Sequence, residues 1–281
     1  MVFQRLIWAA LAVAVVVGSL QSGVQQLQAV PIILAAEVFE SQKVETHAAA
    51  APAAAPAPAT ATTHTHADAA AHTHAEAAAE PWAPADGLER VFWTWAANVL
   101  HAFSMALLVF VVMGLSLARG SKLPSLTLAA WVAAAGWLTF HFWPSLGLHA
   151  EIPGMDAARL GSRQGWWVLA AASAALACGS LAMLRNPWRW AAAAAWLAVP
   201  YVVGAPHITA DPLAGFSGEA QATLRQLGTQ FIWATTWVSL SFWVSLGVVG
   251  GLAFQRWVRP ALLAVLQRAE APAVGAVQAP Q

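Results

Sequence analysis

Histidine supplies most of the residues in this chain whose type and spacing point to chemistry. An eight-residue repeat reads HTHADAAA over 64–71 and HTHAEAAA over 72–79, so two HxH pairs each precede a carboxylate: His64 and His66, then His72 and His74. Imidazole is a good ligand for zinc, copper, nickel and cobalt, and a flexible segment can wrap such a metal without prior folding. The repeat therefore predicts weak metal collection, with a low-complexity spacer as the alternative interpretation.

A second set of candidate ligands lies in or beside apolar stretches. Ionisable side chains inside a membrane are costly, so by default they indicate a functional site. The alternative is a histidine that only packs or hydrogen-bonds against a neighbouring helix. We expect the metal ligands of this set to be Glu37, Glu40, His101, His141 and His207, with His149 close by in the chain.

Uncharged polar residues accompany these candidates within the apolar stretches. Gln21, Gln25 and Gln28 are spaced as one stripe of a helix, and Asn98 and Met105 share a helix face with His101. Amides in a membrane usually hydrogen-bond between helices, although they can also line a hydrated path. Both interpretations, pathway and packing, remain open from the sequence.

The composition excludes a soluble enzyme as the main body of the protein. Only 9% of the 281 residues are charged, against about 25% in a typical soluble domain, and 59% are hydrophobic. The formal net charge of zero argues against nucleic acid as a partner. The single cysteine, Cys178, excludes an intramolecular disulfide, and no P-loop sequence is present. We expect a protein of the lipid bilayer that is not an enzyme.

Six apolar stretches approach the roughly 20 residues that a helix needs to cross a membrane. They cover about 6–30, 92–117, 124–145, 165–184, 188–206 and 229–255. The first continues to Glu37, with a break expected near Pro31. The sequence therefore predicts an all-α, polytopic membrane helix bundle of about six transmembrane helices, or five if the first is a cleaved signal peptide.

Composition divides the chain into four parts. Residues 1–37 form the first span and its outer exit, 38–90 a His-rich periplasmic loop, 91–258 the rest of the bundle, and 259–281 a cytoplasmic tail. The stretch 46–84 consists mainly of Ala, Pro, Thr and His. Such a segment cannot bury enough apolar surface to offset its chain entropy, so we expect a flexible, disordered external loop.

The distribution of charge predicts the orientation in the membrane. With the N-terminus in the cytoplasm and six spans, eight of the 13 basic residues fall inside and 12 of the 13 acidic residues fall outside. The positive-inside rule counts Lys and Arg in short loops, and the turns at 119–122 and 185–189 each carry two. We therefore expect both termini in the cytoplasm.

The segment between the third and fourth stretches carries the most specific motif. It reads HFWPSLGLHAEIPGMDAARLGSRQGWW over 141–167; its prolines and glycines exclude one continuous helix, and 156–164 reads as a short helix. The segment closely resembles the signature of the CbtA family, a proposed cobalt transporter subunit. QQLQAVPIILAAEVFE, NVLHAFSMALL and VVGAPHI agree as well. The motif residues are Pro144, Glu151, Pro153, Gly154, Arg163, Gln164, Trp166 and Trp167.

The resemblance implies a permease subunit of the bacterial inner membrane that takes up Co²⁺ for cobalamin synthesis. It implies a small one-span, His-rich partner, CbtB, and no tightly bound cofactor. Residue types alone indicate only a divalent transition metal. Two other functions remain open: a haem-binding electron-transfer subunit that uses His101 and a second histidine, and a metal-binding scaffold that does not transport.

Overall fold

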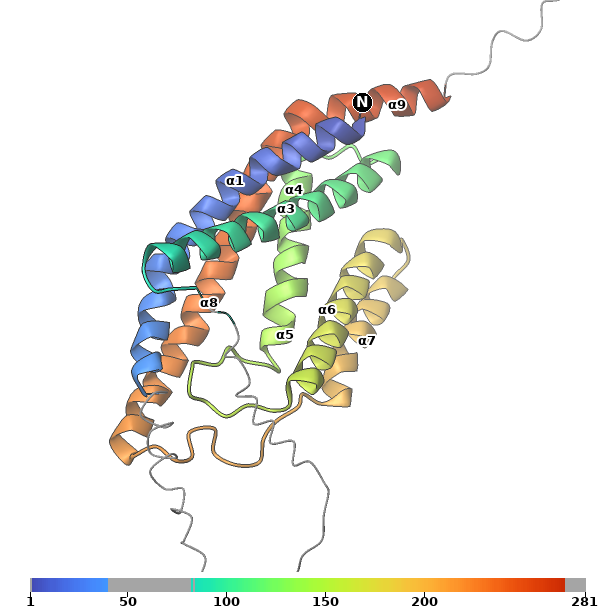
Figure 1. The fold of residues 1–281 in the computed structure, drawn as a ribbon. Coiled ribbons are helices and arrows are strands. Elements are labelled where there is room, and N and C mark those ends of the chain that lie inside the picture. Colours follow the sequence, from blue (N-terminus) through green and yellow to red (C-terminus); the bar gives the residue numbers. More distant parts are fainter. Residues whose placement is uncertain (1, 40–81, 83, 271–281) are drawn as a thin grey trace, which may run out of the picture.

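The computed structural model describes residues 2–39, 82 and 84–270 (Figure 1). These residues form helices and connecting loops, with no β-strand among them, which confirms the predicted all-α bundle. The main helices are α1 (Val2–Gln28), a short helix Val30–Phe39, α3 (Leu88–Ala118), α4 (Ser125–Trp137), α6 (Leu160–Met183), α7 (Trp188–Val203), α8 (Gly218–Ala253) and α9 (Arg259–Glu270). Two π-helical segments interrupt them: η1 (Leu138–Phe142), followed by α5 (Trp143–Ser145), and η2 (Phe254–Val258).

Five of the described helical segments are long and apolar enough to cross a membrane: Val2–Gln28, Leu88–Ala118, Ser125–Ser145, Leu160–Met183 and Gly218–Ala269. The fifth predicted span, 188–206, is shorter than expected. Helix α7 has 16 residues, or about 24 Å, and it ends at Gly204, whose φ of +85° breaks the helix. A bilayer core is about 30 Å thick, so α7 does not meet the length of a full span.

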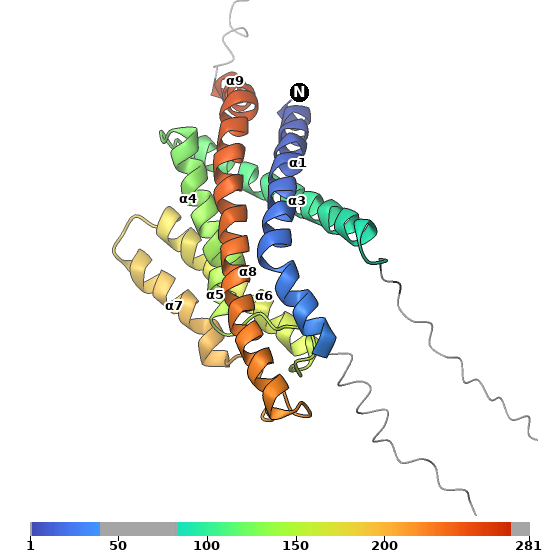
Figure 2. The same cartoon turned by 90° about the vertical axis from the view of Figure 1, so that its left-hand side faces the viewer.

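The helices pack through small residues. Figures 1 and 2 show α1 beside α8 in the opposite direction, α4 against α8, α3 crossing α1, and α6 and α7 as a hairpin. A Cβ atom added at Gly18 would lie 2.6 Å from the Val99 Cα atom, so α1 and α3 approach each other closely. Added Cβ atoms at Gly247 and Gly251 would lie 3.0 and 2.9 Å from Ala133 and Ala129 of α4. The GxxxG pair of α8 is therefore a packing face.

Each π segment ends two residues before a proline, Pro144 or Pro260. A proline inside a helix has no N–H to donate, and its ring presses on the carbonyl four residues back. In both places the residue before the proline, Trp143 or Arg259, donates its N–H to a carbonyl five residues back instead of four. The extra residue turns the following side chains by roughly 100° relative to an uninterrupted helix.

The bundle has two distinct ends. The N-terminal end holds the start of α1, the turn 119–124, η2 and α9; the loop end holds the loops 146–159 and 204–217 (Figure 1). The main apolar core joins α1, α3, α4, α8 and η2. A smaller core at the loop end is formed by Ala36, Ile152, Leu213 and Leu224, which join four separate parts of the chain.

Other boundaries differ from those expected. The break in the first apolar stretch lies at Ala29, two residues before Pro31, and helix resumes to Phe39. The short helix expected over 156–164 is wrong: residues 156–159 are not helical, and α6 begins at Leu160 because Arg159 has an extended ψ of 129°. Part of the expected C-terminal tail is helical, since α9 continues to Glu270.

Candidate functional site

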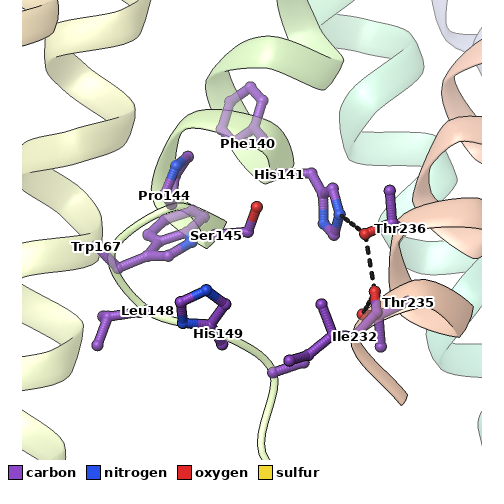
Figure 3. A pocket seen from close by; sticks show the side chains of 11 residues that line it. Phe140, His141, Pro144, Ser145, Leu148, His149, Trp167, Ile232, Thr235 and Thr236 are labelled. Atoms are coloured by element: carbon purple, nitrogen blue, oxygen red, sulfur yellow. Dashed lines mark hydrogen bonds between the residues drawn. The ribbon is translucent and has the colours of Figure 1, made fainter. Parts of the chain in front are cut away.

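A pocket of about 180 Å³ lies at the loop end, between η1–α5, the following loop, and α8. Its polar lining consists of His141, His149, Ser145, Thr235 and Thr236, and Phe140, Pro144 and Trp167 form part of its apolar wall. Figure 3 shows the rings of His141 and His149 at this space, one from the helix and one from the loop. The structure therefore brings two imidazoles and several hydroxyls together.

His141 is placed by η1. Its Nε2 lies 3.4 Å from the Thr236 Oγ1 atom, and the Thr236 hydroxyl donates to the Ile232 carbonyl at 2.8 Å (Figure 3). Because that hydroxyl proton is already engaged, its oxygen accepts from His141, which assigns the ring proton to Nε2. A neutral imidazole with this tautomer keeps the lone pair of Nδ1 for a metal or another donor.

His149 is placed by the motif loop rather than by a helix. A Cβ atom added at Gly147 would lie 2.2 Å from the Trp166 ring, so the loop passes close over that ring. The indole of Trp166 is buried and donates to the Pro200 carbonyl at 2.9 Å, which fixes its position. The loop that carries His149 therefore rests on a rigid aromatic surface.

The remainder of the motif loop is tied down by polar contacts. Arg163 and Glu151 form an ion pair at 2.5 Å, and both side chains are about 30% exposed. The Asp156 N–H donates to the Pro212 carbonyl at 2.8 Å, which joins the two loops of this end. Gly154 has a φ of +84°, which an L side chain rarely adopts, so a glycine follows Pro153 at this turn.

The other motif residues divide between the packing and the surface. Pro144 and Trp166 are buried, and Trp167 lines the pocket with its ring 6.3 Å from that of Phe140. Gln164 is exposed on α6, and its side chain has no hydrogen bond to the described residues. The motif residues therefore contribute mainly to the apolar wall of the pocket and to the packing beneath it, and less to its polar lining.

Two imidazoles with neighbouring hydroxyls suit a borderline divalent transition metal that keeps some of its water. Among residues 2–39, 82 and 84–270, no group of three or more His, Cys, Asp and Glu side chains is arranged to hold a metal. A pocket with few ligands favours binding that is weak enough to release an ion again.

The remaining predicted ligands lie apart from this pocket. Glu37 is bound by Arg90, whose Nη2 and Nη1 atoms lie 2.6 and 3.4 Å from its two carboxylate oxygens. The His101 ring lies 5.1 Å from that of Phe242 and is partly exposed, and His207 is exposed in the loop after α7. Glu40 and the repeat histidines, His64, His66, His72 and His74, lie outside the described residues.

The three glutamines of the predicted stripe differ in their surroundings. Asn98 donates to Gln25 at 2.7 Å and to the Ser22 hydroxyl at 3.0 Å, so these residues link α3 to α1. Gln21 is buried with its Oε1 atom unpaired in the described part of the chain, and Gln28 is exposed. Met105 packs against the main core. The contacts of Gln25 and Asn98 are those of packing residues.

Several lining residues were not found from the sequence. Ser145, Thr235 and Thr236 carry no spacing signal, because hydroxyls are common in apolar helices and usually bond the carbonyl four residues back. His149 stood beside the other candidates without an assigned role. The only available signal was its place within the motif loop, eight residues after His141.

No curated protein and no solved structure shows significant similarity to the chain. A family model described as probable cobalt transporter subunit (CbtA) matches residues 3–255, which include nearly all of α1, the motif loop and all of α8. The chain therefore belongs to the CbtA family of probable cobalt transporter subunits.

Proposed function

We propose that this protein takes up Co²⁺ across the bacterial inner membrane and that the His141–His149 pocket is where the ion first binds. The observation that carries the proposal is the convergence of two imidazoles on one pocket of about 180 Å³ at one end of the bundle. The lone pair left on His141 Nδ1 supplies a ligand atom, and the hydroxyls nearby replace part of the hydration shell.

The charge distribution supports an external location for this pocket. The described acidic residues, except Glu270 at the end of α9, lie in or beside the segments that the charge count assigns to the outside, as do both histidines of the pocket. An ion arriving from the periplasm would therefore meet the loop end first. A divalent ion gains about 4.6 kcal/mol on crossing a −100 mV potential, so uptake does not require ATP hydrolysis by this chain.

This orientation has its own test. In a variant whose Cys178 is replaced by serine, single cysteines introduced at positions 60 and 121 are treated with a membrane-impermeant reagent from outside intact cells. We expect position 60 to react and position 121 to be protected. The opposite pattern contradicts the orientation and moves the pocket to the cytoplasmic side.

Two further proposals concern the partner of this chain and the use of the imported cobalt. The word subunit in the family description supports a complex, and the partner that we propose is CbtB, the small one-span protein with its own His-rich segment. We also propose that the imported cobalt serves cobalamin synthesis. Co-purification of the two chains from detergent tests the first proposal, and cobalamin yield at limiting cobalt in a deletion strain tests the second.

The central experiment is uptake of radioactive cobalt into vesicles that contain the purified protein, with and without CbtB. His141→Ala and His149→Ala each remove one imidazole from the pocket, so we expect the half-saturating cobalt concentration to rise on the order of tenfold. Deletion of residues 62–79 removes the repeat and is expected to reduce uptake mainly at limiting metal, because it takes away only a collecting segment.

His101→Ala is the matched control, since it removes the same side chain from α3, where the ring packs against Phe242. Little change in this variant is expected if the ion binds first at the pocket. If His101→Ala abolishes uptake while His141→Ala and His149→Ala behave like the parent, the ion path follows α3 and the proposed pocket is wrong. A Soret band in the purified protein would favour the haem alternative instead.

A further inference from the structure

A second pocket lies at the opposite, N-terminal end of the bundle and is larger, about 720 Å³. Its lining comes from the start of α1 and from η2. Figures 1 and 2 show the start of α1 beside the end of α8 and the start of α9. Its polar and aromatic lining consists of Gln4, Arg5, Trp8, Arg256 and Trp257. The pocket shares no residue with the histidine pocket and has no role in the proposed uptake.

The chemistry of this pocket is cationic. Arg5 and Arg256 bring two guanidinium groups from different elements to one space, and no described acidic side chain lines it. The ion pairs found within the described residues involve neither arginine. Two such groups without a carboxylate partner favour an oxyanion, and guanidinium matches the geometry of phosphate through paired N–H donors.

The π segment η2 determines which side chains reach the pocket. Phe254 and Val258 are buried at 1% and 2% exposure and anchor η2 in the main core. Arg256 and Trp257, between them, are exposed toward the start of α1.

The pocket also continues into an apolar stripe. Trp8, Leu11 and Val15 of α1 are 69%, 40% and 45% exposed, and their spacing of three and four residues places them on one helix face. A free phosphate ion has no apolar part that would contact this stripe, whereas a phospholipid would place its acyl chains there. Tryptophan at the pocket also suits the boundary between headgroups and hydrocarbon.

From these observations we infer that the Arg5–Arg256 pocket binds the phosphate group of an anionic phospholipid. The guanidinium groups contact the phosphate, the Gln4 amide donates a further hydrogen bond, and the two tryptophans flank the headgroup. The acyl chains run along the exposed stripe of α1. Basic pockets between membrane helices are known to hold anionic headgroups in this way.

The test uses the full chain in mild detergent and counts bound lipids by native mass spectrometry, with phosphatidylglycerol and phosphatidylcholine as probes. We expect the parent to retain phosphatidylglycerol preferentially. Arg5→Gln and Arg256→Gln should each weaken that binding about fivefold, and the double variant about 30-fold. Arg5→Lys and Arg256→Lys keep the charge and should keep most of the preference.

Arg119→Gln is the matched control, because Arg119 is an exposed arginine at the same end of the bundle outside the pocket. Both pocket arginines are exposed, so the variants should fold, and an unchanged melting temperature checks this.

The inference is overturned if the double variant retains phosphatidylglycerol like the parent, or if phosphatidylcholine binds equally well. Displacement of the lipid by millimolar inorganic phosphate would instead assign the pocket to a soluble anion. The readout is lipid binding, so failure of the uptake proposal would leave it unaffected.

Discussion

The arginines at the two ends of the bundle differ in their contacts with carboxylates. At and near the loop end, three arginines each bind a carboxylate on a different element: Arg90 with Glu37, Arg163 with Glu151, and Arg225 with Asp211. At the N-terminal end, the ion pairs of the described residues include no arginine. Arg5 and Arg256 line the second pocket, and the Arg259 guanidinium donates to the Ser125 hydroxyl at 3.4 Å.

The difference follows from what each end must hold together. The loop end contains long irregular segments without helical hydrogen bonds, and its three ion pairs join such segments or helix ends to a helix. The N-terminal end needs no such ties, because short turns join its helices and apolar packing fixes η2. Its positive charges therefore remain available to the membrane. Rigidity at one end accompanies the metal-binding candidates, and unpaired charge at the other accompanies the lipid pocket.

The largest effect is expected where the loop end is most tightly packed. In Gly147→Ala the new methyl group would lie 2.2 Å from the Trp166 ring, which is buried and held by its bond to the Pro200 carbonyl. Since the ring cannot move freely, overpacking should cost about 2 kcal/mol of unfolding free energy. The measurement is the thermal unfolding of the purified variant in detergent.

Gly165→Ala supplies the control for this variant, because α6 offers open space at that position. Alanine is favoured over glycine inside a helix, so stability should stay equal or rise by up to about 1 kcal/mol. Equal melting temperatures for both variants would show that the motif loop yields easily. The contrast between a rigid loop end and a freer N-terminal end would then be wrong.

A smaller effect is expected from the ion pair of the motif loop. Arg163→Gln or Glu151→Gln leaves one partly buried charge without its partner. The expected loss of unfolding free energy is about 1.5 kcal/mol, which lies between the values typical of surface ion pairs and of fully buried ones. The charge-swapped double variant should recover most of this loss. Arg159→Gln, four residues away and exposed, is the control and should unfold like the parent. Failure of the swap to recover stability would show that the pair is incidental.

The helices were predictable because their signal is local. Long apolar stretches, helix-breaking glycines and the proline near residue 31 all act within a few residues, and the C-terminal ends of the apolar helices lie close to those expected. Several helices begin earlier than expected, above all α8, which begins at Gly218 rather than at 229. The exceptions have local causes that were harder to weigh. Gly204 ends α7 early, and the extended backbone at Arg159 delays α6. The π segments depend on Pro144 and Pro260, whose effect on a continuing helix cannot be read from hydropathy.

The candidate site was less predictable because it is a matter of tertiary contact. His141 and Thr236 are 95 residues apart in the chain, and no spacing rule relates them. His101, His207 and Glu37 were grouped with His141 because they share a membrane side, but their contacts in the structure are separate. The sequence therefore indicated the residue types and the motif loop that line the candidate pocket. It did not indicate which of those residues would share a pocket.

The last and smallest stability effect concerns Glu37 and Arg90, where the structural tie and the proposed metal role compete. Their side chains are 35% and 37% exposed, so Glu37→Gln should cost only about 0.5 to 1 kcal/mol. Glu89→Gln, an exposed carboxylate on the first turn of α3, is the control and should cost only about 0.3 kcal/mol, from its lost interaction with the helix N-terminus. The informative variant combines Glu37→Arg with Arg90→Glu, which keeps the pair but exchanges its ends. Because Arg90 already occupies both oxygens of Glu37, we expect the exchanged variant to be stable and to take up cobalt like the parent. A variant that is stable but has lost uptake would show that the carboxylate at position 37 contacts the metal, and would extend the binding site from the histidine pocket to the end of the first apolar helix.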